Sequence, residues 1–247
     1  MNSEQRDAVR ALEIFADICE KHNIDYYLLA GTCLGGVRHK GMIPWDDDID
    51  VGVPNEQYDK LNQVIAKELS VPYLWKNECD DYPRFFGKIV KDQNACVDVF
   101  RLVKFPDNWL GRQVVWVSQK LLFRTINIKF HHKERIVVRN FIMNPMTTFF
   151  SRILSYHQIQ NIRKKIEQYS EKHSGKYRIN LYSVYSMEKE MIPQKWLDTT
   201  SAITFEGRLY PTVSDPHEYL THLYGDYMTP PPESERSIKR HSNKFLR

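Results

Sequence analysis

The sequence predicts an α/β fold of the α+β type, in which a mixed β-sheet is flanked by helices and carries a basic, mainly helical insertion. Helix-like and strand-like hydrophobic patterns alternate over residues 4–102, as is typical of helices packed on a sheet. The charge is also uneven. The block from Trp109 to Lys165 has eleven basic residues and one acid, Glu134, so it carries +10, while the remainder carries −6 of the net +4.

The hydrophobic spacing predicts each element in order. Apolar residues at helical spacing predict two amphipathic helices, and strict alternation of side-chain type predicts a half-buried strand. The expected elements are a helix over 4–21, a strand over 26–30 with a Gly31-Thr32 loop and a short helix over 33–39, a strand over 48–53, a helix of about 15 residues carrying Tyr58 to Leu69, and strands over 85–90 and 95–102.

We expect one domain over 1–247 with three zones. Residues 1–108 form the catalytic sheet core, residues 109–175 form the basic helical insertion, and residues 176–247 form a C-terminal segment that completes the site. Within the insertion, Asn144-Pro145 interrupts the helical pattern. The pattern resumes from Phe149 to His173.

Composition excludes several classes of protein. With 42% apolar and 13% aromatic residues the chain can build a hydrophobic core, which excludes a disordered protein. The four cysteines are widely spaced and do not form a zinc motif. The start of the chain lacks a signal-peptide pattern, and no apolar run reaches the length of a spanning helix. We therefore expect a cytoplasmic protein, peripheral at the inner membrane face.

The strand Asp48-Ile49-Asp50-Val51 carries the richest chemistry. Because side chains alternate on a strand, Asp48 and Asp50 share one face and repel each other unless a cation lies between them. An EF-hand loop is excluded, since its sixth position would be Val51 instead of glycine and its twelfth Gln57 instead of glutamate. A solvated acidic turn is the alternative.

A third acid, Asp98, stands alone in the apolar strand Ala95 to Phe100. A buried carboxylate is costly unless it is paired or binds a metal. One interpretation is an ion pair with Lys88 on the neighbouring strand. The other places Asp98 beside Asp48 and Asp50, which completes a three-carboxylate site for Mg²⁺ or Mn²⁺.

The glycine-rich run Gly31 to Gly36 precedes the acidic strand. Glycines allow backbone N–H groups to approach a phosphate, and a helix N-terminus favours an anion. The spacing fits neither a P-loop nor a dinucleotide-binding motif. Beside the acids, the run indicates a phosphate held against a metal ion; by itself it is equally compatible with a plain turn.

The run from Ala30 to Gly52, AGTCLGGVRHKGMIPWDDDIDVG, resembles the signature of the LicD/fukutin family, within the nucleotidyltransferase-fold superfamily. The run from Leu223 to Pro232, LYGDYMTPPP, resembles the second landmark of that family, and Phe205-Glu206-Gly207 is similar to the motif before it. The resemblance covers the chain from about Cys19 to Pro232 with a poorly matching middle, and its first motif is long and specific.

This resemblance implies a nucleotidyltransferase-like sheet and an enzyme. The implied reaction is metal-dependent transfer of a substituted phosphate, such as phosphocholine, from a CDP-activated donor to a hydroxyl of a cell-surface glycan precursor (lipopolysaccharide, capsule or teichoic acid), with release of CMP. In the superfamily pattern Gly31 and Thr32 hold donor phosphates, and Asp48, Asp50 and Asp98 bind the metal. One departure is Val103, where members often carry a second aspartate.

Further residues are candidates for substrate contacts. Arg38 and Lys88 are candidates for phosphate, and Glu206 or Asp226 for orienting the acceptor hydroxyl. Aromatic side chains can cage a choline headgroup through cation–π attraction. The candidates for the cage are Trp45, Tyr82, Tyr224 and Tyr227, each of which is also an ordinary core residue type.

Two other functions stay open at this point. A D-x-D glycosyltransferase would use a sugar nucleotide with the same acids, although the upstream Gly-Thr run favours the first interpretation. A binding module without catalysis would use the Trp109–Lys165 block on nucleic acid or anionic lipid, but it would leave the acids unexplained. We expect the block to face a glycan or lipid-linked glycan acceptor or the membrane, unless it is only a solvated face, and we expect no nucleic-acid partner.

Overall fold

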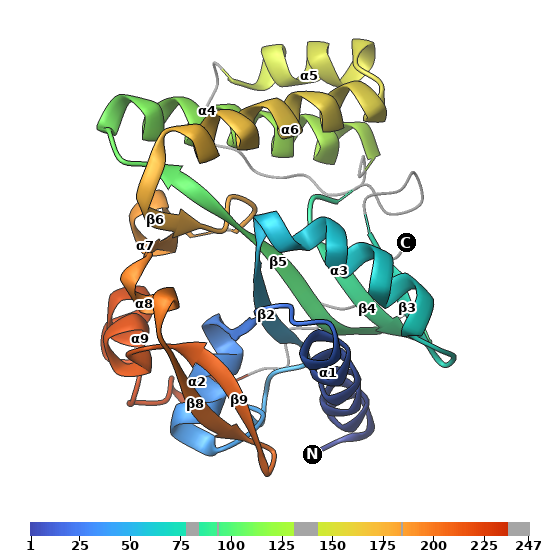
Figure 1. Ribbon diagram of the computed structural model, residues 1–247, viewed down its shortest axis with the longest axis vertical. Coiled ribbons are helices and arrows are strands. Elements are labelled where there is room, and N and C mark those ends of the chain that lie inside the picture. The colour runs from blue at the N-terminus through green and yellow to red at the C-terminus, as the bar shows by residue number, and fades with distance from the viewer. Residues whose placement is uncertain (78–83, 93, 131–142, 184, 237–247) are drawn as a thin grey trace.

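The computed structural model describes residues 1–77, 84–92, 94–130, 143–183 and 185–236. Its main sheet contains β1 to β7, with the central order β1-β2-β5-β4-β3 and with β6 and β7 continuing from the far end of β5 (Figure 1). β2 and β5 are parallel, and every other pair is antiparallel. The predicted mixed sheet flanked by helices is confirmed.

The N-terminal elements follow the predicted order. They are α1 (Ser3–Lys21), β1 (Tyr27–Leu28), α2 (Ala30–His39), β2 (Ile49–Pro54), α3 (Asn55–Glu68), β3 (Tyr73–Lys76), β4 (Gly87–Lys91) and β5 (Asn94–Pro106). α1 starts with a capping box in which the Asn2 side chain accepts from the Gln5 backbone and Gln5 reciprocates. The sequence pattern missed β3.

Two boundaries differ from the prediction. β1 is only two residues long, and α2 already begins at Ala30, so Gly31 and Thr32 lie in the first turn of a helix and not in a loop. Ala30 has a positive φ of 43°, which turns the chain directly from strand to helix. β5 extends past residue 102 because its second half pairs with β6 (Ser174–Ile179).

The basic block forms a helical layer at one end of the molecule (Figure 1). It consists of α4 (Trp109–Phe130), α5 (Met143–Ile153) and α6 (Tyr156–Lys172). The break predicted at Asn144-Pro145 is displaced. α5 begins at Met143 and holds Pro145 in its first turn, where the missing N–H has no helical partner to lose. The predicted helix over 149–173 is instead divided at Ser155, which caps α6.

The C-terminal segment is built of short elements. They are α7 (Met187–Glu190), β7 (Met191–Pro193), α8 (Lys195–Asp198), β8 (Thr200–Phe205), β9 (Arg208–Val213), α9 (Pro216–Tyr224) and a 3-10 turn (Glu233–Glu235). β8 and β9 form a separate hairpin that packs on α2. The division into zones ending at residues 108 and 175 stays an interpretation.

Three groups of buried side chains hold these layers together. The first lies between the sheet and helices α1 and α3 and includes Ile49, Val51 and Val97. The second packs α2 against α8, α9 and the hairpin. The third joins the end of β5 to the helical layer, and Val103 and Phe105 contribute to it with no exposed surface. Val103, where the resemblance leads one to expect a second aspartate, is therefore a packing residue.

A buried ion pair anchors the helical layer. Arg163 on α6 is 1% exposed and donates to both Glu167 oxygens at 2.9 and 3.1 Å and to Gln160 at 2.7 Å. The Tyr182 hydroxyl donates to Glu167 at 2.6 Å. The bonds of Arg163 lie within α6, and the bond from Tyr182 joins the same carboxylate to the segment that follows β6.

We predict that Glu167→Ala lowers the free energy of unfolding by about 3–5 kcal/mol, because it leaves the Arg163 charge buried without its carboxylate. Denaturant unfolding measures the change. The matched control is Glu13→Ala, which removes the exposed Arg10–Glu13 pair and should cost about 0.5 kcal/mol or less. A Glu167→Ala effect as small as the control would show that the pair does not anchor the layer.

Candidate active site

The three acids predicted to share a site converge on neighbouring strands. In the parallel pair β2–β5, Asp50 lies opposite Asp98, and in the antiparallel pair β5–β4, Asp98 lies opposite Lys88. Asp50, Asp98 and Lys88 therefore form one row across three strands. Asp48, Asp50 and Asp98 each offer an oxygen, and these oxygens lie within 4.8 Å of one another.

The opposite face of the same strands fixes this row. Ile49, Val51, Val97 and Val99 have no exposed surface and point into the first core group. Because the strand period is two, burying these side chains directs the acids to the other face. The structure thus confirms that the alternation of apolar and acidic residues along the strand places the acids on one face.

Asp98 is paired with Lys88 and also lies beside the other two acids. The Lys88 ammonium lies 2.7 Å from Asp98 Oδ1, and both residues are buried. Asp98 also lies among the clustered acids. One lysine offsets one of three carboxylates, so the site retains an excess of negative charge.

The repulsion among these carboxylates raises the pKa values of two of them. Burial, and then repulsion from neighbouring carboxylates including Asp98, raises the pKa of Asp48 and of Asp50 well above the ordinary value. The Lys88 charge opposes the rise at Asp50. A hard divalent cation relieves such repulsion and prefers oxygen ligands, so the donor set fits Mg²⁺ or Mn²⁺. Asp46 and Asp47 form a second group with Asp48, which extends the acidic surface along the loop.

The loop before β2 is anchored at both ends. The buried Gln5 amide of α1 donates to the backbone oxygen of Asp46 at 2.9 Å. The Glu206 carboxylate accepts from the Met42 backbone at 2.8 Å. Glu206 was predicted as an acceptor-orienting group, but its carboxylate holds this loop and is not one of the clustered acids. Sequence patterns cannot reveal a contact between residues 164 positions apart.

Gly31 and Thr32 lie directly beside the acids. The Thr32 hydroxyl accepts from the Asp50 backbone N–H at 2.7 Å, which joins the first turn of α2 to β2. A Cβ on Gly31 would lie 3.1 Å from Asp46 Oδ2 and 4.0 Å from Asp50 Oδ2. Glycine therefore leaves open the space between the helix start and the carboxylates.

The other predicted phosphate ligand, Arg38, is engaged elsewhere. Its guanidinium donates to the Tyr227 backbone oxygen at 2.6 Å. Burial and the nearby Arg236 lower its pKa. Trp45 packs edge-on to His39 and lies under the Arg236 guanidinium, 5.1 Å from the ring centre. These residues tie the C-terminal segment to α2.

The described members of the predicted aromatic cage each pack against another ring. Trp45 packs on His39, Tyr227 bonds and packs against His217, and Tyr224 packs on Tyr185. Tyr82 lies outside the described residues. Asp226 accepts from the Thr229 backbone and hydroxyl, which lowers its pKa and makes it an exposed turn cap.

The charge of Asp50 acts on three tyrosines of the C-terminal segment. Burial chiefly raises the pKa of Tyr185, Tyr219 and Tyr224, and the Asp50 charge adds to each of these shifts. The Tyr219 hydroxyl accepts from the Ala30 backbone at 3.1 Å, at the start of α2. Only Tyr224 among them was predicted, because Tyr185 and Tyr219 reach the site through the tertiary fold of the C-terminal segment.

Glu190, at the end of α7, is a further acid that sequence reasoning missed. Burial raises its pKa to about 7, while a hydrogen bond with Ser183 and the charge of Lys120 oppose the rise. Its charge contributes to the raised pKa of Asp50. Lys120 on α4 donates to the Ser183 backbone oxygen at 2.7 Å, and burial lowers its pKa. A lone glutamate in a short element gives no sequence signal.

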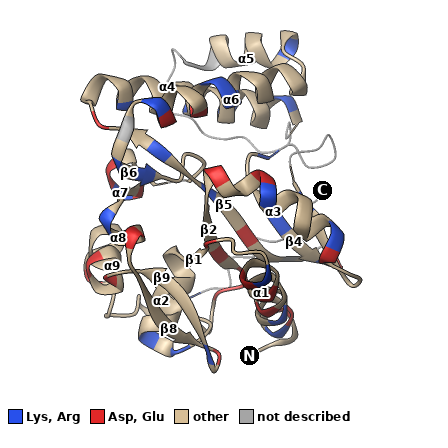
Figure 2. Ribbon diagram, viewed as in Figure 1, with Lys and Arg blue, Asp and Glu red and all other residues tan. Residues whose placement is uncertain are grey.

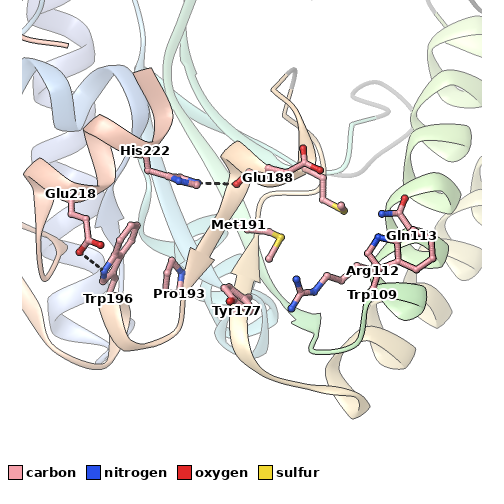
Figure 3. A pocket seen from close by; sticks show the side chains of 11 residues that line it. Trp109, Arg112, Gln113, Tyr177, Glu188, Met191, Pro193, Trp196, Glu218 and His222 are labelled. Atoms are coloured by element: carbon pink, nitrogen blue, oxygen red, sulfur yellow. Dashed lines mark hydrogen bonds between the residues drawn. The ribbon is translucent and has the colours of Figure 1, made fainter. Parts of the chain in front are cut away.

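A pocket of about 480 Å³ lies between the start of α4 and the C-terminal segment (Figure 3). Aromatic, acidic and sulfur-containing side chains share its wall, and none of the clustered acids lines it. The lining residues are Trp109, Arg112, Gln113, Tyr177, Met187, Glu188, Met191, Pro193, Trp196, Glu218 and His222. α7 thus borders the pocket with Glu188 and ends at Glu190, whose charge acts on Asp50.

The helices in the described part of the chain were also compared with the requirements of a membrane span. None of them is both long enough and apolar enough to cross a bilayer.

Comparisons with known proteins agree with this geometry. A lipopolysaccharide cholinephosphotransferase, LicD, of Haemophilus influenzae is 25% identical over 253 residues, which cover 96% of this chain and 94% of that protein. An uncharacterized protein of Rickettsia prowazekii is 34% identical over 121 residues, 45% of each chain. The ribitol 5-phosphate transferase FKRP of Mus musculus is 23% identical over 108 residues, 42% of this chain and 21% of that protein.

The family model described as LicD/FKTN/FKRP, nucleotidyltransferase domain, matches residues 23–155. The match covers more than half of the chain and includes Asp48, Asp50 and Asp98. It confirms the resemblance drawn from the glycine-rich run and the acidic strand. The chain therefore belongs to the LicD/FKTN/FKRP family and is an enzyme of the LicD phosphotransferase type.

Proposed function

We propose that this enzyme transfers a substituted phosphate, phosphocholine or a similar group, from a CDP-activated donor to a hydroxyl of a cell-surface glycan precursor, and that the reaction requires Mg²⁺ or Mn²⁺. The observation that carries the proposal is the convergence of three carboxylates beside the start of α2. The relative from Haemophilus influenzae, named a lipopolysaccharide cholinephosphotransferase, aligns with nearly the whole chain and supports the phosphocholine class.

In this reaction the acceptor oxygen forms a bond to the transferred phosphorus, and the bond from that phosphorus to the CMP oxygen breaks. The acceptor hydroxyl releases its proton to solvent water, and CMP leaves with the bonding electron pair. A metal ion bound by Asp48, Asp50 and Asp98 supplies charge neutralisation for the donor diphosphate and the leaving group. Lys88 holds Asp98 in place by its ion pair, which keeps the third ligand aligned with Asp50.

We propose that the donor phosphates bind at the start of α2. The first N–H groups of a helix lack intrahelical partners and carry partial positive charge, so they attract an anion. Gly31 leaves room beside the carboxylates, and the bond from Asp50 to Thr32 fixes the distance between the helix start and the metal ligands. Arg38 is not proposed as a phosphate ligand, since it bonds the C-terminal segment.

A cationic headgroup fits the tyrosines near the acids. A quaternary ammonium is attracted to aromatic faces and to negative charge. Tyr185 and Tyr224 pack edge to face with ring centres 6.1 Å apart, and both are influenced by the Asp50 charge. We propose these two tyrosines as the headgroup wall in place of Trp45 and Tyr227. The acceptor is a glycan or a lipid-linked glycan, and the enzyme acts in the cytoplasm at the inner face of the membrane.

Family membership sets aside the binding module without catalysis, because the family consists of transferases. The remaining alternative is a glycosyltransferase that uses the acids with a sugar nucleotide.

A donor screen distinguishes these two kinds of enzyme. We predict that the protein with Mg²⁺ releases CMP from CDP-choline or a CDP-linked polyol, and that EDTA abolishes this release. Release of UDP from a sugar nucleotide, with no CMP from any CDP-linked donor, would contradict the proposal.

We predict that Asp50→Asn and Asp98→Asn each lower the transfer rate by on the order of a thousandfold, because each removes a metal charge and keeps the shape of the side chain. The same Asp50→Asn variant should be more stable than the wild type in EDTA, since the raised pKa means that the Asp50 charge opposes folding. Adding Mg²⁺ should raise the Tm of the wild type but not of the variant.

The matched control for these variants is Asp59→Asn, an exposed aspartate on α3, which should change neither activity nor the Mg²⁺ effect on Tm. Thermal unfolding with and without Mg²⁺ measures stability independently of turnover. The three-acid site is excluded if Asp50→Asn keeps a Mg²⁺-dependent rise in Tm equal to that of the wild type.

The raised pKa of Glu190 makes a separate prediction for stability. The Glu190 carboxyl releases its proton near pH 4.5 in the unfolded chain and near pH 7 in the folded chain. The free energy of unfolding therefore falls as the pH rises from 4.5 to 7, and Glu190 causes no further decrease above pH 7. Glu190→Gln should therefore gain Tm relative to the wild type over that pH range, by about 2–4 °C for each kcal/mol. Glu188→Gln, an exposed neighbour, is the control. A Glu190→Gln difference that does not depend on pH would show that Glu190 ionises normally.

A further inference from the structure

α5 is amphipathic in the reverse sense to an ordinary surface helix. Its buried side carries the small polar side chains Thr147 and Ser151, which are 0% and 6% exposed. Its outer side carries Phe149, Ile153 and Met146, which are 60%, 55% and 41% exposed. A helix of a globular protein normally turns its apolar stripe to the core. The outer side of α5 is therefore built for an apolar environment outside this chain.

The neighbouring helix repeats this feature. Leu110, Val114 and Val117 of α4 recur at i, i+4 and i+7, which places them on one side of the helix, and they are 66%, 49% and 46% exposed. The opposite side of α4 carries Val115 and Ile126, which are buried in the third core group toward β5. We call the six exposed residues of α4 and α5 the apolar face.

The apolar face belongs to one layer at one end of the molecule. α5 packs on α4, and Figure 1 shows α5 outermost in this layer, on the side away from the sheet. The Lys129 ammonium of α4 donates to the Ser151 backbone oxygen at 3.1 Å and holds the polar side of α5 inward. Exposed apolar side chains gathered on two adjacent helices mark an interaction site.

Every charged residue of α4 and of α5 is basic. Residues 109–130 and 143–166 contain no acid, and Figure 2 shows lysines and arginines distributed over these helices. Arg152 is exposed on α5, between Phe149 and Ile153 in the chain. The first acid after this stretch, Glu167, is buried in its bond to Arg163. Two helices that combine exposed apolar side chains with basic residues alone match the surface of an anionic bilayer.

We propose that the apolar face docks on the surface of an anionic lipid bilayer. A second copy of this chain is a poorer partner, because a two-fold contact would bring two basic faces together. A bilayer takes up the apolar side chains and supplies the opposite charge.

The pocket of Figure 3 lies next to the docked surface. Trp109, which is 70% exposed, precedes the exposed apolar residues of α4 and also lines this pocket. This placement suits a lipid-linked acceptor, although docking itself does not depend on the proposed reaction.

Vesicle sedimentation with the full chain tests the proposal. We expect binding to phosphatidylcholine vesicles that contain phosphatidylglycerol, weaker binding to phosphatidylcholine alone, and a loss of affinity at high salt. The double substitution Phe149→Ser and Ile153→Ser should lower the partition coefficient by on the order of tenfold or more. Arg152→Glu should weaken binding only to the anionic vesicles.

The matched control is Leu209→Ser, which replaces a side chain that is 64% exposed on β9, away from the helical layer, and should leave vesicle binding unchanged. Because all these side chains are exposed, unchanged Tm values show that the variants fold. Absence of wild-type binding to anionic vesicles would overturn the proposal, as would wild-type binding by the double variant. A dimer in solution that the double variant loses would assign the apolar face to a second copy. None of these readouts requires a donor nucleotide, so failure of docking and failure of the proposed transfer are distinguishable.

Discussion

The repulsion among Asp48, Asp50 and Asp98 is the constraint on which the rest of the structure depends. Three carboxylates within 4.8 Å would separate in a flexible chain. Here the parallel pairing of β2 with β5 sets Asp50 opposite Asp98, and the buried valines and isoleucine on the other face prevent the strands from shifting register. The packing of α1 and α3 on that face thus keeps the three carboxylates close together, although their mutual repulsion favours separation.

The same constraint explains the contacts around the site. Gln5, Thr32 and Glu206 come from three distant parts of the chain, and each bonds backbone on either side of the acidic run. They restrain the loop at Met42 and Asp46 and the strand at Asp50, where repulsion would otherwise move the chain. Lys88, on the neighbouring strand, offsets part of the charge through its ion pair with Asp98. The site is therefore rigid and still negative.

The acids and most regular elements could be predicted from the sequence because they depend on local periodicity. Alternation placed Asp48 and Asp50 on one face, and a solitary acid in an apolar strand identified Asp98. Glu206, Arg38 and Asp226 were assigned to substrate because they lie in matching motifs, yet their bonds join α2 and its loop to the C-terminal segment or cap a turn. Glu190, Tyr185 and Tyr219 were missed for the converse reason, since only tertiary folding brings their charge or rings near Asp50.

Val103 links the site to the basic layer. β5 carries Asp98 in its first half, beside β2, and runs on to pair with β6 beneath α4 and α6. Where family members often place a second acid, this chain has a fully buried valine in the core group that joins β5 to the helical layer. A charged side chain at that position would be buried in the core group that contains Phe105, Val115 and Ile159. Removing its charge from water would cost several kcal/mol of free energy. Val103 therefore belongs to the packing that fixes the helical layer on the sheet, and one strand carries both Asp98 and this layer.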